Sequence, residues 1–271
     1  MEGLMKGKRG LVMGVANDHS LAWGIACQLA AAGAELAFTY QGDAFGKRVE
    51  PLAKKLGSRL LLPCDVEDVR SVDAVFTRLK EEWGTLDFVV HAIAFSDKAE
   101  LKGRYVDVTS RENFSRTMIV SAFSFTEIAQ RAAPLMREGG TILTLTYGAS
   151  RQVVPNYNVM GVAKAALEAM VRTLAADLGP QNIRVNAISA GPVRTLAGNG
   201  IGDARAIFAY QRRNAPLRRT VDIQEIGKSA LYLLSDFSSG VTGEIHYVDS
   251  GYNIISMPSL EELNQSEQAN Q

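Results

Sequence analysis

The chain has 271 residues, with 29 lysines and arginines against 29 aspartates and glutamates and a formal net charge of zero at pH 7. Because the charges balance, no long-range field attracts nucleic acid or an anionic membrane surface, and neither is expected as a main partner. Apolar residues make up 46% of the chain and charged residues 21%, which are the proportions of a folded globular protein and exclude a disordered one.

Cysteine and histidine are scarce. The two cysteines, Cys27 and Cys64, exclude a disulfide framework and a multi-cysteine zinc site. The three histidines have no paired spacing, so no metal site is predicted. No apolar run approaches the ~18 residues that cross a bilayer, and the first ten residues contain none of signal-peptide length. We therefore expect no membrane span and a cytoplasmic location.

Short apolar runs rich in β-branched residues alternate along the chain with longer stretches of helical spacing. The predicted strands are residues 11–14, 36–40, 60–62, 88–93, 141–147, 185–188 and 244–248, and the predicted helices include residues 21–32, 69–82, 111–137 and 159–178. This alternation is typical of the α/β class and predicts a doubly wound parallel sheet. Residues 1–257 are expected to form one domain, and residues 258–271 a polar, loosely ordered tail.

Glycines mark the predicted helix ends. Gly33, Gly57 and Gly84 each follow a helix, where a left-handed cap favours glycine, and Gly179-Pro180 follows the helix at residues 159–178. That last helix is apolar around most of its circumference, through Ala163, Ala166, Leu167, Met170, Val171 and Leu174. Burial under a neighbouring helix of the same chain and burial in a subunit interface explain this equally well.

The first strand leads into a turn with the spacing Gly14-x5-Ser20-x-Ala22-x-Gly24. In a doubly wound sheet this turn holds a nucleotide diphosphate against the helix amides. Gly14 permits the turn, the Ser20 hydroxyl can bond helix amides or a phosphate, and Ala22 and Gly24 are small enough for a close diphosphate or strand approach. A capped helix after a strand looks the same, so the pattern alone leaves both readings open.

The next two strand ends carry candidate adenosine contacts. Gln41 stands where an acid would bond the ribose diol and an arginine would suit a 2′-phosphate, which favours NADH over NADPH, although Lys47 and Arg48 lie nearby. Asp65, with Val66 beside it, can accept from an adenine amino group. A helix-start cap is the alternative role for Asp65.

Two tyrosines and a lysine follow the fifth strand: Tyr147 at its end, and then Tyr157-x6-Lys164. If Tyr157 opens the next helix, Lys164 lies about 10.5 Å further along and only ~20° around it, so both share one face, with Gly161 leaving that face open. Helical side chains lean towards the N-terminus, which brings the lysine back towards Tyr157. An ammonium near a phenol stabilises developing phenolate character, and it can also bond ribose hydroxyls.

These motifs, together with residues 184–195 (RVNAISAGPVRT), identify a resemblance that runs over residues 6–257. The chain resembles the short-chain dehydrogenase/reductase superfamily, and most closely its divergent branch, the bacterial NADH-dependent enoyl-acyl-carrier-protein reductases. Ordinary members of the superfamily use Tyr-x3-Lys, an upstream serine and a G-x3-G-x-G turn, and this chain has neither spacing. The resemblance implies a Rossmann-type reductase domain with a substrate-binding loop and helix after strand six.

The resemblance also implies an activity and its residues. NADH would deliver hydride to the β-carbon of a trans-2-enoyl thioester on acyl carrier protein, and charge would accumulate on the thioester oxygen. Tyr157 would donate to that oxygen, because an oxyanion needs a preorganised donor. Lys164 would mainly anchor the nicotinamide ribose. Tyr147 would also be catalytic, either orienting the substrate or relaying a proton.

Further positions carry over from the family. The cofactor residues would be Gly14, Ser20, Leu21, Gln41, Asp65, Val66, Ile93, Lys164, Val193, Arg194, Thr195, Leu196 and Ala197. The substrate residues would be Phe95, Ser96, Met160, Ile201 and Ile207. Arg205, Arg212 and Arg213 either meet the acidic carrier protein or form a solvated face. The family suggests a homotetramer.

Two other functions remain possible from the sequence. A carbonyl reductase of the same superfamily would act on a 3-oxoacyl thioester, against which the x6 spacing and the missing serine argue. A regulator that binds a dinucleotide without chemistry would not need Tyr157 and Lys164 together.

Overall fold

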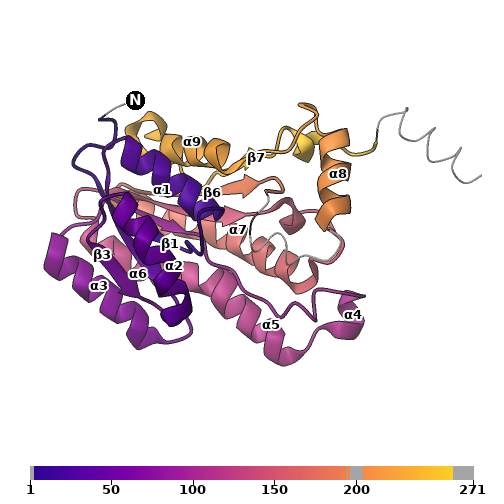
Figure 1. The fold of residues 1–271 in the computed structure, drawn as a ribbon, viewed down its shortest axis with the longest axis horizontal. Helices are drawn as coiled ribbons and strands as arrows, with labels where there is room; N and C mark the ends of the chain where they lie inside the picture. The colour runs from indigo at the N-terminus through magenta and orange to yellow at the C-terminus, as the bar shows by residue number, and fades with distance from the viewer. Residues whose placement is uncertain (1–2, 194, 196–203, 259–271) are drawn as a thin grey trace, which may run out of the picture.

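Seven parallel strands form one sheet in the computed structural model, which describes residues 3–193, 195 and 204–258 (Figure 1). The strands are β1 (Arg9–Met13), β2 (Glu35–Tyr40), β3 (Leu60–Pro63), β4 (Phe88–His91), β5 (Gly140–Thr146), β6 (Ile183–Ala190) and β7 (Ile245–Val248). Their order across the sheet is β3-β2-β1-β4-β5-β6-β7. The predicted doubly wound parallel sheet is therefore confirmed, with strand bounds shifted by one or two residues.

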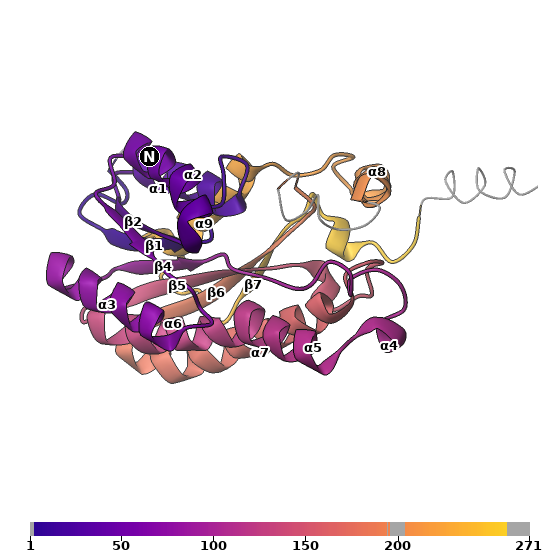
Figure 2. The same cartoon turned by 60° about the horizontal axis from the view of Figure 1, so that its bottom comes forward.

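Helices cover both faces of the sheet (Figure 2). One face carries α1 (Leu21–Ala31), α2 (Gly42–Lys55) and α9 (Ile223–Leu234), and the other carries α3 (Val69–Trp83), α6 (Ser124–Ala132) and α7 (Asn158–Leu178). Each layer has its own apolar core, with Ile25 and Leu29 in the first and Phe125 and Leu167 in the second. The α8 helix (Ala204–Asn214) stands beyond the end of β6. Within the described residues, no helix is long and apolar enough to span a membrane.

The helix predicted over residues 111–137 is interrupted. The segment begins as α5 (Arg111–Met118), which is followed by a π-helical segment, η1 (Ile119–Phe123). It then continues as α6 and ends in a 3₁₀ turn, η2 (Ala133–Leu135). The π segment adds a residue to the turn, which changes the faces of the residues that follow it. There the Ser121 hydroxyl accepts from the Phe95 amide at 2.9 Å and donates to the Phe95 carbonyl at 3.0 Å. Apolar periodicity cannot reveal such a polar contact.

Three of the four predicted helix caps are confirmed. Gly33, Gly57 and Gly84 have φ of 96°, 73° and 69°, in the left-handed region. Gly179 is not a left-handed cap, since its φ is −53° and it begins a 3₁₀ turn, η4 (Gly179–Gln181). Asn182, with φ 58°, makes the reversal instead. Asparagine tolerates this conformation, and Pro180 favours the turn before it.

Bounds were predicted for neither α2 nor α9, although Gly57 was expected to follow a helix. Pro51 lies inside α2, where proline removes a helical hydrogen bond and hides the pattern. In α9, Gly227 serves packing, since a Cβ there would lie 2.4 Å from the Gly24 carbonyl oxygen of α1. A Cβ on Gly24 would in turn lie 2.3 Å from the Ile223 oxygen. The structure thus corrects the strand approach expected at Gly24, because the element packed against this glycine is helix α9.

The apolar circumference of α7 is largely covered within the chain. Leu167, Val171 and Leu174 are buried in the core beneath the sheet, and Ala166 and Met170 pack partly against it. Neighbouring contacts come from β6, α5, η1 and α6. Burial by elements of the same chain therefore explains most of the pattern. Val162 remains 41% exposed on the outer side of α7.

Candidate active site

The strand order reverses between β1 and β4, and this switch point is where open α/β sheets bind ligands, at the carboxyl ends of the strands. Gly14 directly follows β1 there with φ 96°, and a Cβ on it would lie 2.0 Å from the Ala92 carbonyl oxygen after β4. The predicted need for glycine is confirmed, and it has two causes: the backbone angle and the close approach of the neighbouring loop.

We expect Gly14→Ala to lower the free energy of unfolding by about 2 kcal/mol or more, because the methyl group adds a clash to the cost of a left-handed alanine. Gly57→Ala is the matched control. Gly57 has φ 73° but no neighbouring atom within 4 Å, so its cost is about 1 kcal/mol, from conformation alone. Urea unfolding of both variants measures the difference. Equal losses would show that contact with Ala92 is unimportant.

The Ser20 hydroxyl shapes the first turn instead of capping the helix. It accepts from the Ala16 and Asn17 amides at 3.0 and 3.1 Å and donates to the Asn17 side chain. No side chain caps α1, and its first turn holds no acid. By contrast Asp68, Ser110 and Asp222 cap α3, α5 and α9. The amides and positive end of α1 are therefore available to an anion, and this fits a diphosphate.

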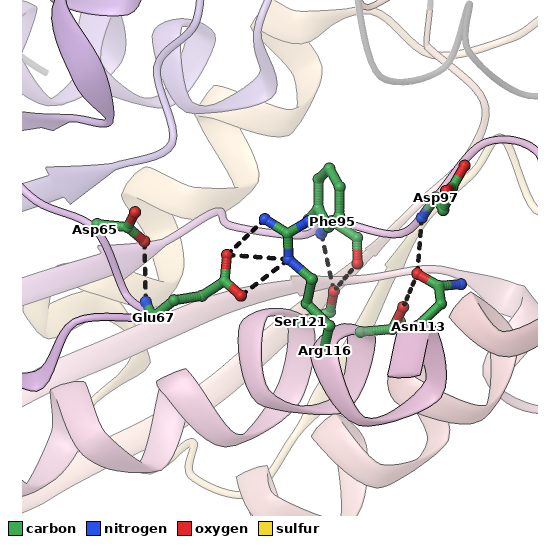
Figure 3. A network of polar contacts seen from close by, with 8 residues as sticks. Asp65, Glu67, Phe95, Asp97, Asn113, Arg116 and Ser121 are labelled. Carbon is green, nitrogen blue, oxygen red and sulfur yellow. Dashed lines mark hydrogen bonds and ion pairs between the residues drawn. The ribbon is translucent and has the colours of Figure 1, made fainter. Parts of the chain in front are cut away.

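Asp65 does not cap α3, since Asp68 does. The Asp65 carboxylate accepts from the Glu67 amide at 2.9 Å, which fixes the loop after β3 (Figure 3). Glu67 in turn forms an ion pair with Arg116 of α5, with Nη2 to Oε2 at 2.7 Å and Nε to Oε1 at 2.9 Å. The Arg116 guanidinium lies 4.3 Å from the centre of the Phe95 ring. One arginine thus connects the loops that follow β3 and β4.

The loop after β4 is also held by α5. Asn113 accepts from the Asp97 amide at 2.9 Å (Figure 3). Its side-chain nitrogen donates to the Ser96 hydroxyl at 3.1 Å. Thr117 donates to the same hydroxyl at 3.0 Å. Ser96 is buried, whereas the neighbouring Phe95 is 41% exposed. Ser96 therefore helps to hold the loop after β4 in place, whereas the Phe95 side chain lies at the surface of the site.

Tyr147 and Tyr157 lie together at the carboxyl end of β5. Their ring centroids are 5.1 Å apart at 61°, an edge-to-face contact. Tyr157 is the residue immediately before α7, between Asn156 and Asn158, which have φ of 58° and 32°. Asn158 donates to the Glu100 and Gly103 carbonyls, which hold this irregular helix start in place. The predicted helix start next to Tyr157 is confirmed.

Both phenols keep their protons at neutral pH. Burial raises the pKa of Tyr157 well above its ordinary value, and Tyr147 adds to the effect. Burial, with smaller contributions from Tyr252 and Asp249, raises the pKa of Tyr147 to about 12, while a hydrogen bond from Gln211 opposes this rise. Within the described chain, the Tyr157 hydroxyl makes no hydrogen bond. It can therefore donate to a bound molecule.

Lys164 lies in α7 below Tyr157 and is 6% exposed. Its Nζ donates to the Leu145 carbonyl of β5 at 2.8 Å, and not to the Tyr157 phenol. Burial lowers the pKa of Lys164 to about 8, and the charge of Glu168 partly offsets that effect. Gly161 does not leave the helix face open, because the Ala149 carbonyl oxygen lies 3.0 Å from the position of its absent Cβ.

The remaining predicted positions are distributed around this edge. Leu21 opens α1, Gln41 is exposed before α2, Val66 is buried after β3, and Ile93 follows β4. Met160 is buried beside Tyr157, and Ile207 is half-buried on α8. Val193 and Thr195 follow β6, both half-buried. Arg194, Leu196, Ala197 and Ile201, as well as tail residues 259–271, lie outside the described residues.

Sequence reasoning missed three polar residues at the site. Glu168, 5% exposed, accepts from the Thr146 hydroxyl at 2.7 Å one helical turn after Lys164, and an acid in so apolar a helix was the available signal. His91 is fully buried between Thr144 and Ser124, and burial together with the Lys164 charge lowers its pKa to about 3, so it is neutral. Gln211 donates to the Tyr147 hydroxyl at 3.3 Å from 64 residues away, a contact without a local signal. Across the described residues, no cluster of three or more potential metal ligands occurs.

Known proteins share this sequence and fold. A family model described as "Enoyl-(Acyl carrier protein) reductase" matches residues 14–253. The "Enoyl-[acyl-carrier-protein] reductase [NADH] 2" of Rhizobium meliloti (strain 1021) is 74% identical over 263 residues, covering 97% of this chain and 98% of the relative. The crystal structure of FabI from Candidatus Liberibacter asiaticus is 63% identical, with a TM-score of 0.93 over 96% of this chain and 100% of that one.

A second solved structure is that of the enoyl-(acyl-carrier-protein) reductase from Anaplasma phagocytophilum in complex with NAD. It is 59% identical and has a TM-score of 0.93, covering 96% of this chain and 99% of that one. The family match spans most of the chain, and the similarity in sequence and fold extends across almost all of it. The chain therefore belongs to the enoyl-(acyl carrier protein) reductase family.

Proposed function

We propose that this protein reduces the trans-2 double bond of enoyl thioesters carried on acyl carrier protein, with NADH as the reductant, during fatty acid elongation. The observation that carries the proposal is the placement of two protonated phenols, Tyr147 and Tyr157, with buried Lys164 at the carboxyl end of β5. This edge of the sheet adjoins the uncapped N-terminus of α1. Family membership supports the same reaction.

Tyr157 acts at the thioester oxygen. When bound, NADH supplies the hydride that adds to the β-carbon of the substrate. Negative charge then develops on the thioester oxygen, where the Tyr157 hydroxyl donates a hydrogen bond. The hydroxyl is held by the fixed start of α7 and keeps its proton because burial raises its pKa. A fixed donor in a site shielded from water stabilises such charge by several kcal/mol.

The chain's own groups fit the dinucleotide. The α1 amides and Leu21 would hold the diphosphate, Gln41 the adenosine ribose, and Lys164 the nicotinamide ribose. The other cofactor contacts we propose are Gly14, Ser20, Asp65, Val66, Ile93, Val193 and Thr195, and the predicted contacts Arg194, Leu196 and Ala197 adjoin them in the sequence. Gln41 brings no positive charge for a 2′-phosphate, which supports NADH over NADPH.

Apolar side chains would receive the acyl chain. We propose that Phe95, Met160 and Ile207 form an apolar wall of the acyl-chain site, and that Ser96 lies beside Phe95. Ile201 is the further apolar residue that the sequence predicts for this wall. Phe95 is suited to this role because its ring is partly exposed while its backbone is fixed by Ser121. The exposed arginines of α8, Arg205, Arg212 and Arg213, would meet the acidic carrier protein.

NADH binding should weaken as the pH rises through about 8. The ammonium of Lys164 is charged below its pKa of about 8 and loses its proton above it, and a charged donor bonds hydroxyls more strongly. Burial lowers the pKa of His91 in β4 to about 3, so His91 is neutral across this pH range. Lys164, which lies beside Glu168, is therefore the group whose charge changes. We expect the Kd to rise several-fold between about pH 7 and about pH 9. In Lys164→Met the Kd should not depend on pH there; an equal slope in both proteins would contradict the assignment.

Turnover assays separate the proposed reaction from its rivals. We expect crotonyl thioester to consume NADH and acetoacetyl thioester to consume neither NADH nor NADPH, followed by the loss of nicotinamide absorbance. Consumption with acetoacetyl thioester alone would indicate a carbonyl reductase. NADH binding without turnover of either substrate would indicate a non-catalytic regulator.

We also propose a homotetramer located in the cytoplasm. Ile119 and Phe123 on η1 and Val162 on α7 are each more than 40% exposed, on adjoining helical segments. Exposed apolar side chains that gather on one side are typical of an interface. Light scattering should give four times the chain mass, and Phe123→Glu should reduce it; a wild-type monomer would contradict the proposal.

A further inference from the structure

Helix α8 contacts the catalytic tyrosine pair through one buried amide. Gln211 is 7% exposed, and its Nε2 donates to the Tyr147 hydroxyl at 3.3 Å. Tyr147 directly follows β5, so this bond joins segments of the chain 64 residues apart. Burying a glutamine side chain is costly unless its polar atoms are bonded, so the contact is a specific one.

The position of Gln211 is fixed by its neighbours. Tyr210 packs edge-to-face on Tyr252, with ring centroids 6.4 Å apart. The chain after α8 is held as well, since the Leu217 amide donates to the Ser250 carbonyl at 3.3 Å. These contacts dock α8 against the segment that follows β7. The helix that carries Gln211 is therefore held in place, and Gln211 contacts Tyr147 from a fixed backbone position.

The Asp249 carboxylate, which lines the same cavity as the Tyr147 hydroxyl, is bound by the backbone of its own turn. Tyr147 and Gln211 line a cavity of about 190 Å³ together with Asp249 and Tyr252. The Asp249 carboxylate accepts from the Gly251 and Asn253 amides at 2.9 and 2.8 Å. Asp249 is thus held by its own turn, and the Gln211 amide donates the hydrogen bond to the Tyr147 oxygen.

A phenol has one proton, and the direction of that proton depends on what the oxygen accepts. Because the Gln211 amide donates, the Tyr147 proton has to point away from it, towards another acceptor. We propose that Gln211 is a positioning residue that orients the Tyr147 hydroxyl for reduction of the enoyl thioester, an inference that rests on the proposed function. Gln211 touches neither substrate nor cofactor in this role; it acts through Tyr147.

A double-mutant cycle tests this role. Gln211→Met keeps the size of the side chain and removes the donor. We expect it to lower kcat/KM about five- to tenfold in the wild-type background, the usual loss for one hydrogen bond, and to have no effect in a Tyr147→Phe background. An equal loss in both backgrounds, or no loss in either, would overturn the proposal. Gln224→Met, which removes an exposed glutamine bond between α9 and α1, is the matched control and should leave kcat/KM unchanged.

Two further measurements keep the test independent of folding and of activity. Gln211→Glu replaces the donor with an acceptor that takes the Tyr147 proton, so its loss should exceed that of Gln211→Met. In protein labelled with ¹³C at the tyrosine Cζ atom, Gln211→Met should shift the resonance that is missing from Tyr147→Phe, and an unmoved resonance would overturn the bond. Failure of wild-type turnover would reject the proposed function; an active wild type with an additive cycle would reject only the role of Gln211.

Discussion

Tyr157→Phe should lower kcat with crotonyl thioester by about 10²-fold, the size of the effect when one preorganised donor to an oxyanion is lost. The phenylalanine ring keeps the edge-to-face packing on Tyr147, so the fold and the cofactor contacts should persist. The Kd for NADH should therefore stay unchanged. Stopped-flow turnover and fluorescence titration of NADH measure the two quantities separately.

Tyr105→Phe is the matched control for this substitution. Tyr105 is 43% exposed in the short helix α4 (Tyr105–Val108), and it has no expected role in the reaction. Its loss of a hydroxyl should leave kcat within twofold of the wild type. Turnover of Tyr157→Phe at the wild-type rate with all acyl substrates would remove Tyr157 from the chemistry. A large rise in its Kd for NADH would mean that the hydroxyl binds cofactor instead.

Lys164→Met should raise the Kd for NADH by about 10- to 100-fold, because the charged donor proposed for the nicotinamide ribose is lost. Methionine fills the buried path of the lysine stem without a charge to desolvate. The Leu145 carbonyl loses its partner, and Glu168 loses a neighbouring positive charge. Isothermal titration measures the Kd, and thermal unfolding checks that the chain still folds.

The surface lysine Lys80 supplies a control for the change in net charge. It lies in the last turn of α3, and it is exposed, so Lys80→Met should leave the Kd for NADH unchanged. An unaltered Kd in Lys164→Met as well would argue against the ribose contact. A higher Kd for NADH in both variants would point to a general electrostatic effect of the lost charge.

The sheet was predictable because its strands are buried runs separated by helices and glycines. The periodicity of 111–137 predicted one helix, and the structure differs because Ser121 satisfies the Phe95 backbone through a π segment. Gly24 was expected to admit a diphosphate or a strand because it lies in the first turn. Its close partner, Ile223, lies about 200 residues away in the sequence, and local patterns carry no information on such a contact.

The candidate site was predictable where its geometry is local. Tyr157 immediately precedes the helix that contains Lys164, so their spacing alone placed them on the same edge, although the Lys164 ammonium bonds Leu145 rather than the phenol. The supporting groups come from distant elements. Arg116 links Glu67 to Phe95 over 49 and 21 residues, and Gln211 reaches Tyr147 over 64. Such contacts depend on the packed tertiary structure.

The most direct test is a crystal structure of the protein with NAD⁺ and an unreactive enoyl thioester analogue. We expect the Tyr157 hydroxyl to lie about 2.5–3.0 Å from the thioester oxygen, at hydrogen-bond distance. A complex in which that oxygen bonds another group, with the Tyr157 hydroxyl turned to solvent, would contradict this expectation.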